Sequence, residues 1–414
     1  MKMDMSHNSH ISQVITNDGW PRPIREEAYY GLAGDIVKVI EPHSEADLVA
    51  LLIQLLATFG NIVGNKPHFT VEDDIHTLKI NPIMVGDTSK ARKGTAWSRI
   101  YKIAKHIDPD WAENNVLSGL SSGEGLIYAV RDSSDNKILD KRILVFEPEF
   151  SSALKVMKRE GNTLSCIIRK AWDSCSLGIL TKNDPLRASD THITIIGHIT
   201  KEDLLRHLTE TEMANGFGNR LLWVCVKRSK CLPEGGKLDD KELNPLIGRL
   251  QEAIKFASSV SEIRRDSEAT RIWREVYPEL SVGKLGMVGA LTARAEAYVM
   301  RLACIYALLD CTAFIRPKHL KAALAVWYYS EDSVLYIFGN KLGDTTADTI
   351  LDALKKNHPN PLTRTDINNL FCRHKNSVDI TRALELLKTK NLATRKVRVT
   401  GGRNEELWYC EISE

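Results

Sequence analysis

The stretch "GDTSKARKGT", residues 86–95, places glycine, basic and hydroxyl residues directly after the apolar run "INPIMV". Phosphate-binding loops use this set: backbone N–H groups at a helix N-terminus hold the phosphates, a lysine reaches the β and γ oxygens, and a hydroxyl binds Mg²⁺. Lys93 and Thr95 have the types for the last two roles, and Gly94 leaves room for close backbone approach. We predict that the nucleotide-binding residues are Gly86, Lys90, Arg92, Lys93, Gly94 and Thr95.

The spacing of this stretch departs from the standard pattern G-x-x-x-x-G-K-[ST]. Counted from Gly86, Lys93 comes one position late, and Arg92 stands where the second glycine belongs. An arginine there would widen the loop or add a second cation. Because some nucleoside-phosphate kinases also end their loop with Lys-Gly-Thr, two interpretations stay open: a nucleotide site, or a basic surface turn.

Carboxylates follow another apolar run. The sequence "RILVFEPEF" puts Glu147 and Glu149 after the run 143–146, at the end of a strand where ligands bind in open α/β sheets. Glu147 is a candidate for holding the water shell of Mg²⁺, and Glu149 for orienting the attacking water. Glu124, in the turn "SSGEG", is a second catalytic candidate or a capping-box acid. The alternative for Glu147 and Glu149 is the acidic first turn of a helix.

A histidine and two arginines complete the candidate catalytic residues. His198 and Thr200 end the apolar run "THITIIGHIT", where His198 is placed to sense a γ-phosphate; alternatively, Thr200 caps a helix and His198 is merely nearby. Arg220 lies in the turn "GFGNR", and Arg228 follows the next strand. Arginines so placed can reach a neighbouring subunit's nucleotide and stabilise transferring charge, whereas the default for a single arginine is a solvated side chain.

Strand and helix patterns alternate in the first 230 or so residues. The stretch 44–64 has helical spacing, and within it we expect a helix with Ser44 as its N-cap and Gly60 as its end. Alternation of strands with helices predicts an α/β fold with a mostly parallel sheet covered on both faces. The expected strands are 67–71, 77–86, 141–150, 191–200 and 219–229.

The pattern changes twice after this core. Residues 239–343 are helical in spacing, and 344–414 read as helix, turn, helix and hairpin, which together predict a winged helix-turn-helix. We therefore expect four regions: an N-terminal arm (1–40), the α/β core (41–238), a helical lid or packing domain (239–343) and a winged-helix DNA-binding domain (344–414).

The last region contains a basic stretch. Residues 355–403 hold 12 Lys and Arg against 3 Asp and Glu, a net charge of +9 in a chain whose total is +3. Such a concentration suits contact with DNA phosphates; the alternative is a solvated basic face on a protein-binding module. The predicted nucleic-acid contacts are Arg382, Lys388, Lys390, Arg395, Lys396, Arg398 and Arg403.

The bulk composition is ordinary for a soluble globular protein, with 43% hydrophobic and 26% charged residues. The eight cysteines form no C-x-x-C pair and no cluster with zinc-ligand spacing. The polar N-terminus lacks the apolar core of a signal peptide, and no apolar run is long enough to cross a bilayer. We expect a cytoplasmic protein with reduced thiols and no membrane partner.

Six segments in order resemble a family. They are "GDTSKARKGT", "SSGEGLIYAVRD", "LVFEPEF", "GFGNRLLWV", "ARAEAYVMRLACIYALLD" and "HLKAALAVWYYSEDSVLYIFG". Together, over residues 33–339, they resemble RecA-like ATPases of phages, plasmids and integrated elements. These often lie beside a primase-polymerase domain and are known as primase-associated helicases or as a domain of unknown function.

The resemblance implies a RecA-like P-loop NTPase core, ATP and Mg²⁺ as cofactors, a homo-oligomeric, hexameric ring, and motion along nucleic acid. Carried over residue by residue, Lys93 and Thr95 are the phosphate-loop pair, with Thr95 and Glu147 as Mg²⁺ ligands. Glu147 and Glu149 match the Walker B position, His198 the sensor and Arg220 the arginine finger. Two features depart from this family. The second glycine of the phosphate loop is missing, which bears on ATP hydrolysis more than on nucleotide binding. The sequence has no primase-polymerase domain before these segments, so we expect any primase to be a separate chain.

Two functions follow from these patterns. The first is an ATP-dependent nucleic-acid motor, a replicative-helicase-like ring of a mobile element whose winged helix contacts DNA. The second is a non-motor DNA-binding initiator or defence factor, in which the RecA-like core is a nucleotide switch or is degenerate.

Overall fold

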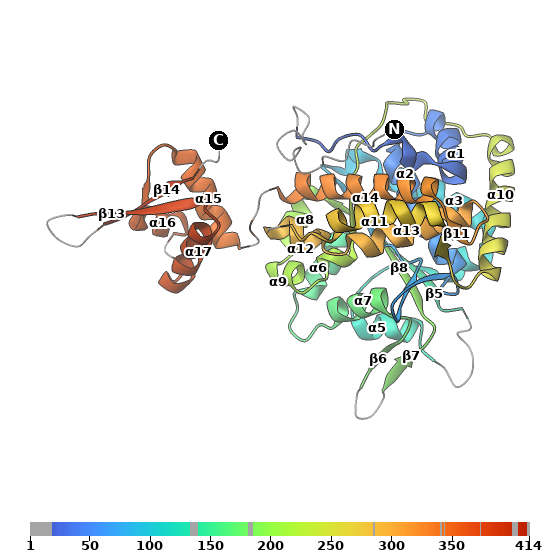
Figure 1. Ribbon diagram of the computed structural model, residues 1–414, viewed down its shortest axis with the longest axis horizontal. Coiled ribbons are helices and arrows are strands. Elements are labelled where there is room, and N and C mark those ends of the chain that lie inside the picture. The colour runs from blue at the N-terminus through green and yellow to red at the C-terminus, as the bar shows by residue number, and fades with distance from the viewer. Residues whose placement is uncertain are drawn as a thin grey trace. The chain divides into compact units, whose positions relative to one another are not determined.

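The computed structural model describes residues 19–132, 140–180, 185–284, 286–339, 342, 344–372, 374–399 and 405–411. The chain divides into two compact units, Met1–Gly339 and Asn340–Glu414 (Figure 1). The helices of the first unit are α1 (Gly31–Ile40), α2 (Leu48–Val63), α3 (Lys93–Ile107), α4 (Pro109–Asn114), α5 (Gly123–Ala129), α6 (Phe150–Met157), α7 (Leu164–Asp173), α8 (Lys201–His207), α9 (Glu210–Ala214), α10 (Asp240–Ser259), α11 (Ser267–Ser281), α12 (Gly286–Thr292), α13 (Ala295–Leu309) and α14 (Pro317–Phe338). Its strands are β1 (His68–Val71), β2 (Asp74–Thr77), β3 (Pro82–Gly86), β4 (Val116–Leu117), β5 (Arg142–Glu147), β6 (Leu177–Ile179), β7 (Leu186–Ala188), β8 (His192–Thr200), β9 (Leu222–Cys225), β10 (Arg264–Arg265) and β11 (Phe314–Ile315).

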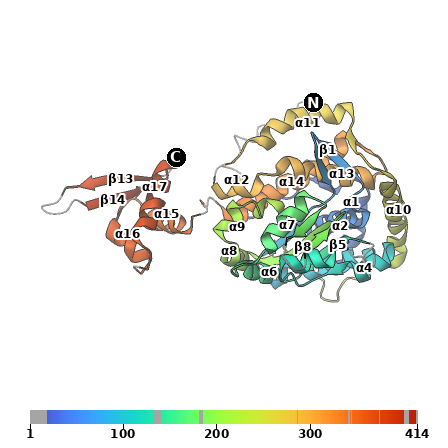
Figure 2. The same cartoon turned by 90° about the horizontal axis from the view of Figure 1, so that it is seen from below.

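The central sheet has five parallel strands in the order β4-β5-β8-β3-β9. Side chains alternate between its faces: Ile195 packs in a core with α5, α6, α7, α8 and α12, and Ile196 packs in another with α2, α3, α10 and α13. Figure 2 shows helices on both sides of β5 and β8. The predicted parallel sheet covered on both faces is confirmed, and it is compatible with a Rossmann-like or RecA-like core.

Helix α14 closes the edge of the sheet at β9. The outward N–H of Cys225 donates to Ser333 Oγ at 3.1 Å, and its carbonyl accepts from Tyr329 Oη at 2.8 Å. Exposed strand edges invite pairing with other chains, and these two side chains take the place of a sixth strand. The first turns of α14 lie in one core and its last turns in the other, so the helix joins the two faces.

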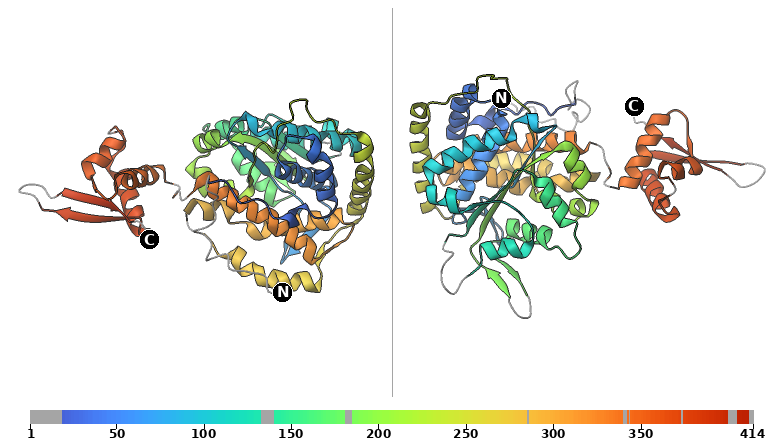
Figure 3. Two further views of the ribbon diagram at one scale, coloured as in Figure 1. Left: turned by 90° about the horizontal axis from the view of Figure 1, so that it is seen from above. Right: turned by 180° about the vertical axis from the view of Figure 1, so that it is seen from behind.

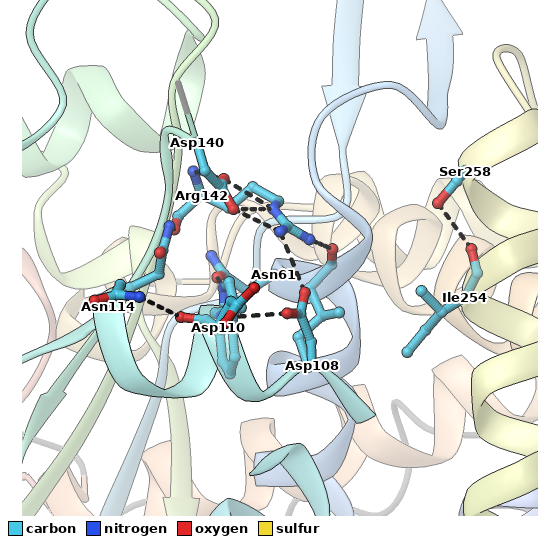
Figure 4. A network of polar contacts seen from close by, with 11 residues as sticks. Asn61, Asp108, Asp110, Asn114, Asp140, Arg142, Ile254 and Ser258 are labelled. Atoms are coloured by element: carbon cyan, nitrogen blue, oxygen red, sulfur yellow. Dashed lines mark hydrogen bonds and ion pairs between the residues drawn. The ribbon is translucent and has the colours of Figure 1, made fainter. Parts of the chain in front are cut away.

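A polar network fixes the amino ends of the strands (Figure 4). Asn61 of α2 donates to the carbonyls of Ile143 at 3.0 Å and His192 at 3.2 Å, which ties β5 to β8. Arg142 is held by Asp140 and by Asp108, whose Oδ2 lies 3.3 Å from Nη2. Because Asn61 bonds two neighbouring strands and Arg142 is the first residue of β5, these contacts fix the amino ends of β5 and β8, opposite the edge that carries the site.

Some sequence-based expectations for local structure are wrong. Helix α2 begins at Leu48 with the Asp47 side chain, not Ser44, accepting from the Val49 N–H. Gly60 lies inside this helix and does not end it. A glycine is needed there for close packing, because a Cβ would come 2.7 Å from the Leu78 carbonyl oxygen. The helix ends instead at Gly64, which has φ 88°.

The segments flanking the α/β core also pack into the first unit. Within the predicted N-terminal arm, Arg22 forms an ion pair with Asp332 of α14 at 2.9 Å, and α1 is mostly buried. Helices α10, α13 and α14, from the predicted helical domain, share the hydrophobic cores of the sheet. Figure 3 shows the β6–β7 hairpin projecting from this unit.

The second unit contains α15 (Thr345–Asn357), α16 (Arg364–Leu370) and α17 (Ser377–Thr389). Strands β12 (Leu362–Thr363), β13 (Ala393–Arg398) and β14 (Glu405–Cys410) form an antiparallel sheet in the order β12-β14-β13. Trp408 of β14 packs with the three helices in a separate core. Arg403 and the rest of the predicted hairpin turn, 400–404, lie outside the described residues.

Across the described ranges, no helix has both the length and the apolar character that crossing a membrane requires.

The β9 edge contact gives a stability prediction. Replacing Ser333 by Ala leaves the buried Cys225 N–H without its acceptor, so the free energy of unfolding of the first unit should fall by about 1–3 kcal/mol. The matched control is Ser258→Ala at an exposed position of α10, where only a bond to the Ile254 carbonyl one turn earlier is lost and the change should stay within about 0.5 kcal/mol. Urea unfolding measures both; equal effects would contradict the edge role of Ser333.

Candidate functional site

Four of the predicted site residues, Gly86, Lys93, Glu147 and His198, gather at the carboxyl edge of the sheet, where strand topology reverses. Strand β3 leads to α3 on one face, and its neighbour β8 leads to α8 on the other. Such a switch point opens a crevice outside the carboxyl ends of the two strands, the usual ligand position in open α/β sheets. Gly86 ends β3, and the register sets it level with Thr200 of β8.

The extra residue of the loop is absorbed by a short 3-10 turn, Ser89–Ala91. The next residue, Arg92, has φ 57° and ψ 27°, the left-handed conformation that glycine adopts most easily. The loop therefore turns as it would with a glycine, at a strain of about 1–2 kcal/mol for a residue with a Cβ. The Arg92 side chain leaves the loop and forms an ion pair with Glu45, Nε to Oε2, at 2.7 Å.

Gly86 is required by close packing. A Cβ on it would lie 2.6 Å from Ala91 Cβ, 3.0 Å from Lys93 Nζ and 3.2 Å from the Val226 carbonyl oxygen. The ammonium of Lys93 thus lies over the end of β3, where it donates to the Thr88 carbonyl at 3.3 Å. Lys93 is 8% exposed, and burial lowers its pKa against the opposing pull of Asp87.

The first turn of α3 has free donors. Arg92 is its N-cap, and the Arg92 side chain makes no capping hydrogen bond. Its first N–H groups belong to Lys93, Gly94 and Thr95, and a Cβ on Gly94 would meet nothing within 4 Å. Thr95 is half-buried, while Lys90 is exposed. Uncapped N–H groups, the helix dipole and a lysine in one place suit an anion.

The three predicted carboxylates have different surroundings. Glu147 is buried, and its Oε1 accepts from the N–H groups of Gly119 and Leu120, both at 2.7 Å. It therefore anchors the loop between β4 and α5, the loop that leads to Glu124. Glu124 is exposed and accepts from Thr163 Oγ1 at 3.0 Å, and Glu149 is exposed at the start of α6.

His198 is buried beside the lysine. Its Nε2 lies 3.3 Å from Gln54 Oε1; the Gln54 amide nitrogen donates to Ala50, so Nε2 is assigned the proton. Burial first, and the charge of Lys93 second, lower the pKa of His198 to about 3. The imidazole is neutral at physiological pH and can contact a phosphate only as a neutral group. Thr200 caps α8, as the alternative interpretation had it.

Arg220 lies at the amino edge of the sheet. Asn81, which precedes β3, donates to its carbonyl at 3.2 Å, and β9 begins only afterwards. The guanidinium is 11% exposed, pairs with Asp173 at 2.6 Å and donates to the Gly216 carbonyl at 2.6 Å. Within its own subunit Arg220 is thus separated from Lys93 by the length of the strands.

The basic residues of the second unit have acidic neighbours. Over the whole unit, 13 Lys and Arg face 10 Asp and Glu, because the acids flank the basic stretch in sequence. Lys390 is exposed after α17, and Lys396 lies 5.1 Å from the Tyr409 ring centroid. Ion pairs join Arg382 to Asp344, Lys388 to Glu385, Arg395 to Glu406 and Arg398 to Glu405.

Sequence reasoning missed Glu45 and Gln54. Both lie next to or within α2, far in sequence from the residues they contact, and nothing in their local spacing distinguishes them. As for metal ligands, no group of three or more His, Cys, Asp or Glu within the described ranges is placed to bind an ion. Mg²⁺ in nucleotide sites commonly takes only one or two protein oxygens, with phosphates and water completing the shell, so the Thr95 hydroxyl fits such a role better than the anchored Glu147.

A scan of the chain against models of known protein families finds no match, and a search of curated proteins finds no similar sequence.

The two loop glycines should respond oppositely to alanine. Gly86→Ala introduces the clashes described above and should lower the free energy of unfolding by about 1–3 kcal/mol. Gly94→Ala meets open space in a helix and should be neutral or raise it by up to about 1 kcal/mol. Urea unfolding of both variants tests this, and a harmless Gly86→Ala would contradict the close packing at the end of β3.

The buried histidine predicts a pH effect. The pKa of His198 is lower in the folded chain than the ordinary value of 6.5, so its stabilising neutral form is fully populated above pH 6.5 and stability falls as pH drops toward 3. Between pH 7.5 and 5 this amounts to about 2 kcal/mol. In His198→Gln, the stability difference from wild type should shrink by that amount over this range. Parallel curves for His198→Gln would contradict the burial of an uncharged ring.

Proposed function

We propose that the protein is an ATP-hydrolysing nucleic-acid motor with a RecA-like core. The observation that carries the proposal is the buried ammonium of Lys93 over Gly86, at the uncapped start of α3 and at the switch point of a parallel sheet. A buried cation beside uncapped N–H donors suits phosphate, and burial lowers the pKa of Lys93 against the opposing pull of Asp87.

Roles follow from the positions of the side chains. Lys93 and the first N–H groups of α3 bind the β- and γ-phosphates, and the Thr95 hydroxyl is available to Mg²⁺, which supplies charge neutralisation when bound. Glu147 holds the β4–α5 loop, leaving Glu124 and Glu149 as the exposed carboxylates that can orient water. Neutral His198, whose pKa is lowered in part by the charge of Lys93, is the candidate sensor of the terminal phosphate.

For the second unit we propose a winged helix-turn-helix that contacts DNA. Its support is the element order, with three helices and a three-stranded antiparallel sheet whose last two strands form a hairpin. The excess of basic over acidic residues is only three, so this contact should be weak and salt-sensitive. A ring, a separate primase and translocation extend the same proposal.

The alternative is a DNA-binding nucleotide switch that does not hydrolyse ATP. One observation favours it: the predicted arginine finger, Arg220, is tied to Asp173 in its own chain. The two functions share the nucleotide site and differ in turnover.

The test is ATP hydrolysis with and without single-stranded DNA. We expect hydrolysis that DNA stimulates, and a fall on the order of 100-fold in Lys93→Ala because its phosphate contact is lost. Lys102→Ala, further along α3 and paired with Asp240 on the surface, should match wild type. Nucleotide binding without hydrolysis would favour the alternative, the nucleotide switch. An unchanged rate of hydrolysis in Lys93→Ala would contradict the proposed nucleotide site.

A further inference from the structure

A motor of the proposed kind needs an arginine at the transferring phosphate, and Arg220 is poorly placed to supply it. Its guanidinium donates to Asp173 through both Nε, at 3.1 Å, and Nη2, at 2.6 Å, and to the Gly216 carbonyl. Nearby Arg294 lies 3.3 Å from the same carboxylate. Releasing Arg220 to a neighbouring subunit would break all of these bonds.

Arg228 lies at the edge that holds the phosphate loop. The pairing of β9 with β3 continues to Val226, whose N–H donates to Val85 at 2.8 Å. The Val226 carbonyl oxygen is 3.2 Å from the position of a Cβ on Gly86. The chain therefore passes the end of β3 directly before Arg228, with only Lys227 between them.

One carboxylate joins Arg228 to the phosphate loop. Glu45 Oε2 pairs with Nε of Arg92 at 2.7 Å, and Glu45 Oε1 pairs with Nη2 of Arg228. The same Oε1 accepts from the Leu232 N–H at 2.7 Å. Two guanidinium groups thus share one carboxylate, which leaves this cluster with one positive charge in excess. Each arginine also keeps further N–H donors, because a guanidinium has five.

The segment that carries Arg228 is pinned along its length. The Lys227 N–H donates to Asp47 Oδ2 at 2.8 Å, and the Ser229 N–H donates to the Glu45 carbonyl at 3.1 Å. Lys230 pairs with Glu41 one step further on. Pre-organised donors stabilise developing charge better than mobile ones, because little reorganisation is needed when the charge forms.

We propose that Arg228 binds the terminal phosphate of the nucleotide held by its own subunit, and that Glu45 is the positioning residue that holds it there beside Arg92. The inference rests on the proposed function and replaces an arginine finger supplied between subunits by one supplied within the subunit. Arginines of both kinds serve phosphoryl transfer, so the chemistry itself does not require a neighbour.

The experiment measures steady-state ATP hydrolysis by the full-length chain, by three variants of the proposed site and by one control variant. Arg228→Gln should lower kcat by about 100-fold with KM changed by less than about threefold, because the contact strengthens in the transition state. Arg228→Lys, which retains the charge and the pairing with Glu45, should fall between this variant and wild type. Glu45→Gln should lower kcat by about tenfold, since the arginine is present but less well held. The matched control is Arg271→Gln, which removes an exposed arginine paired with Glu275 on α11 and should leave kcat unchanged.

A mixing test separates action within a subunit from action between subunits. Arg228→Gln keeps Lys93, and Lys93→Ala keeps Arg228, so mixing the two variants restores activity only if Arg228 serves a neighbour's nucleotide. We expect the mixture to show the sum of its parts. Restoration on mixing, or wild-type kcat in Arg228→Gln, would overturn the inference while leaving the proposed function intact. Absence of hydrolysis, or hydrolysis unaffected by Lys93→Ala, would instead overturn the proposed function and the inference with it.

Discussion

The missing Cβ of Gly86 is the constraint on which the site depends. The 3-10 turn, the ammonium of Lys93 and the chain leaving β9 all approach this one backbone position, at 2.6 to 3.2 Å from where a side chain would begin. Any larger residue would push apart the loop, the start of α3 and the segment that carries Arg228. A single glycine thus allows three elements to meet at the carboxyl edge of the sheet.

Charge is balanced differently at the two edges of that sheet. At the carboxyl edge Lys93 is buried with carbonyl oxygen rather than carboxylate against it, whereas Arg92 and Arg228 share Glu45. At the amino edge Arg220 and Arg294 share Asp173. The first arrangement keeps positive charge available to an anion, and the second uses it to join α7, the start of β9 and the start of α13.

The second unit shows how folding changes the meaning of a charge count. The window 355–403 has a net charge of +9, but Glu405, Glu406 and Asp344 lie just outside it in sequence and beside its arginines in space. Antiparallel pairing of β13 with β14 brings Arg395 opposite Trp408 and within reach of Glu406. A polyanion binding here would have to compete with these internal partners.

The sequence by itself determined the class of fold and the position of the loop. Apolar runs followed by helical spacing are local properties, so β3, β5, β8 and β9 were predictable, as was the convergence of Gly86, Glu147 and His198 on one edge of a parallel sheet. Local patterns could not reveal that Gly60 continues a helix, because the reason is its approach to Leu78. Only the tertiary structure decided which charges are paired: that Arg92 takes a glycine's conformation and turns to Glu45, that Glu147 anchors a loop, and that Arg220 and Arg228 lie at opposite edges. The physical reason is that ion pairs and close packing join residues tens to hundreds of positions apart. The spacing of residues along the chain does not show which of them lie close together in space.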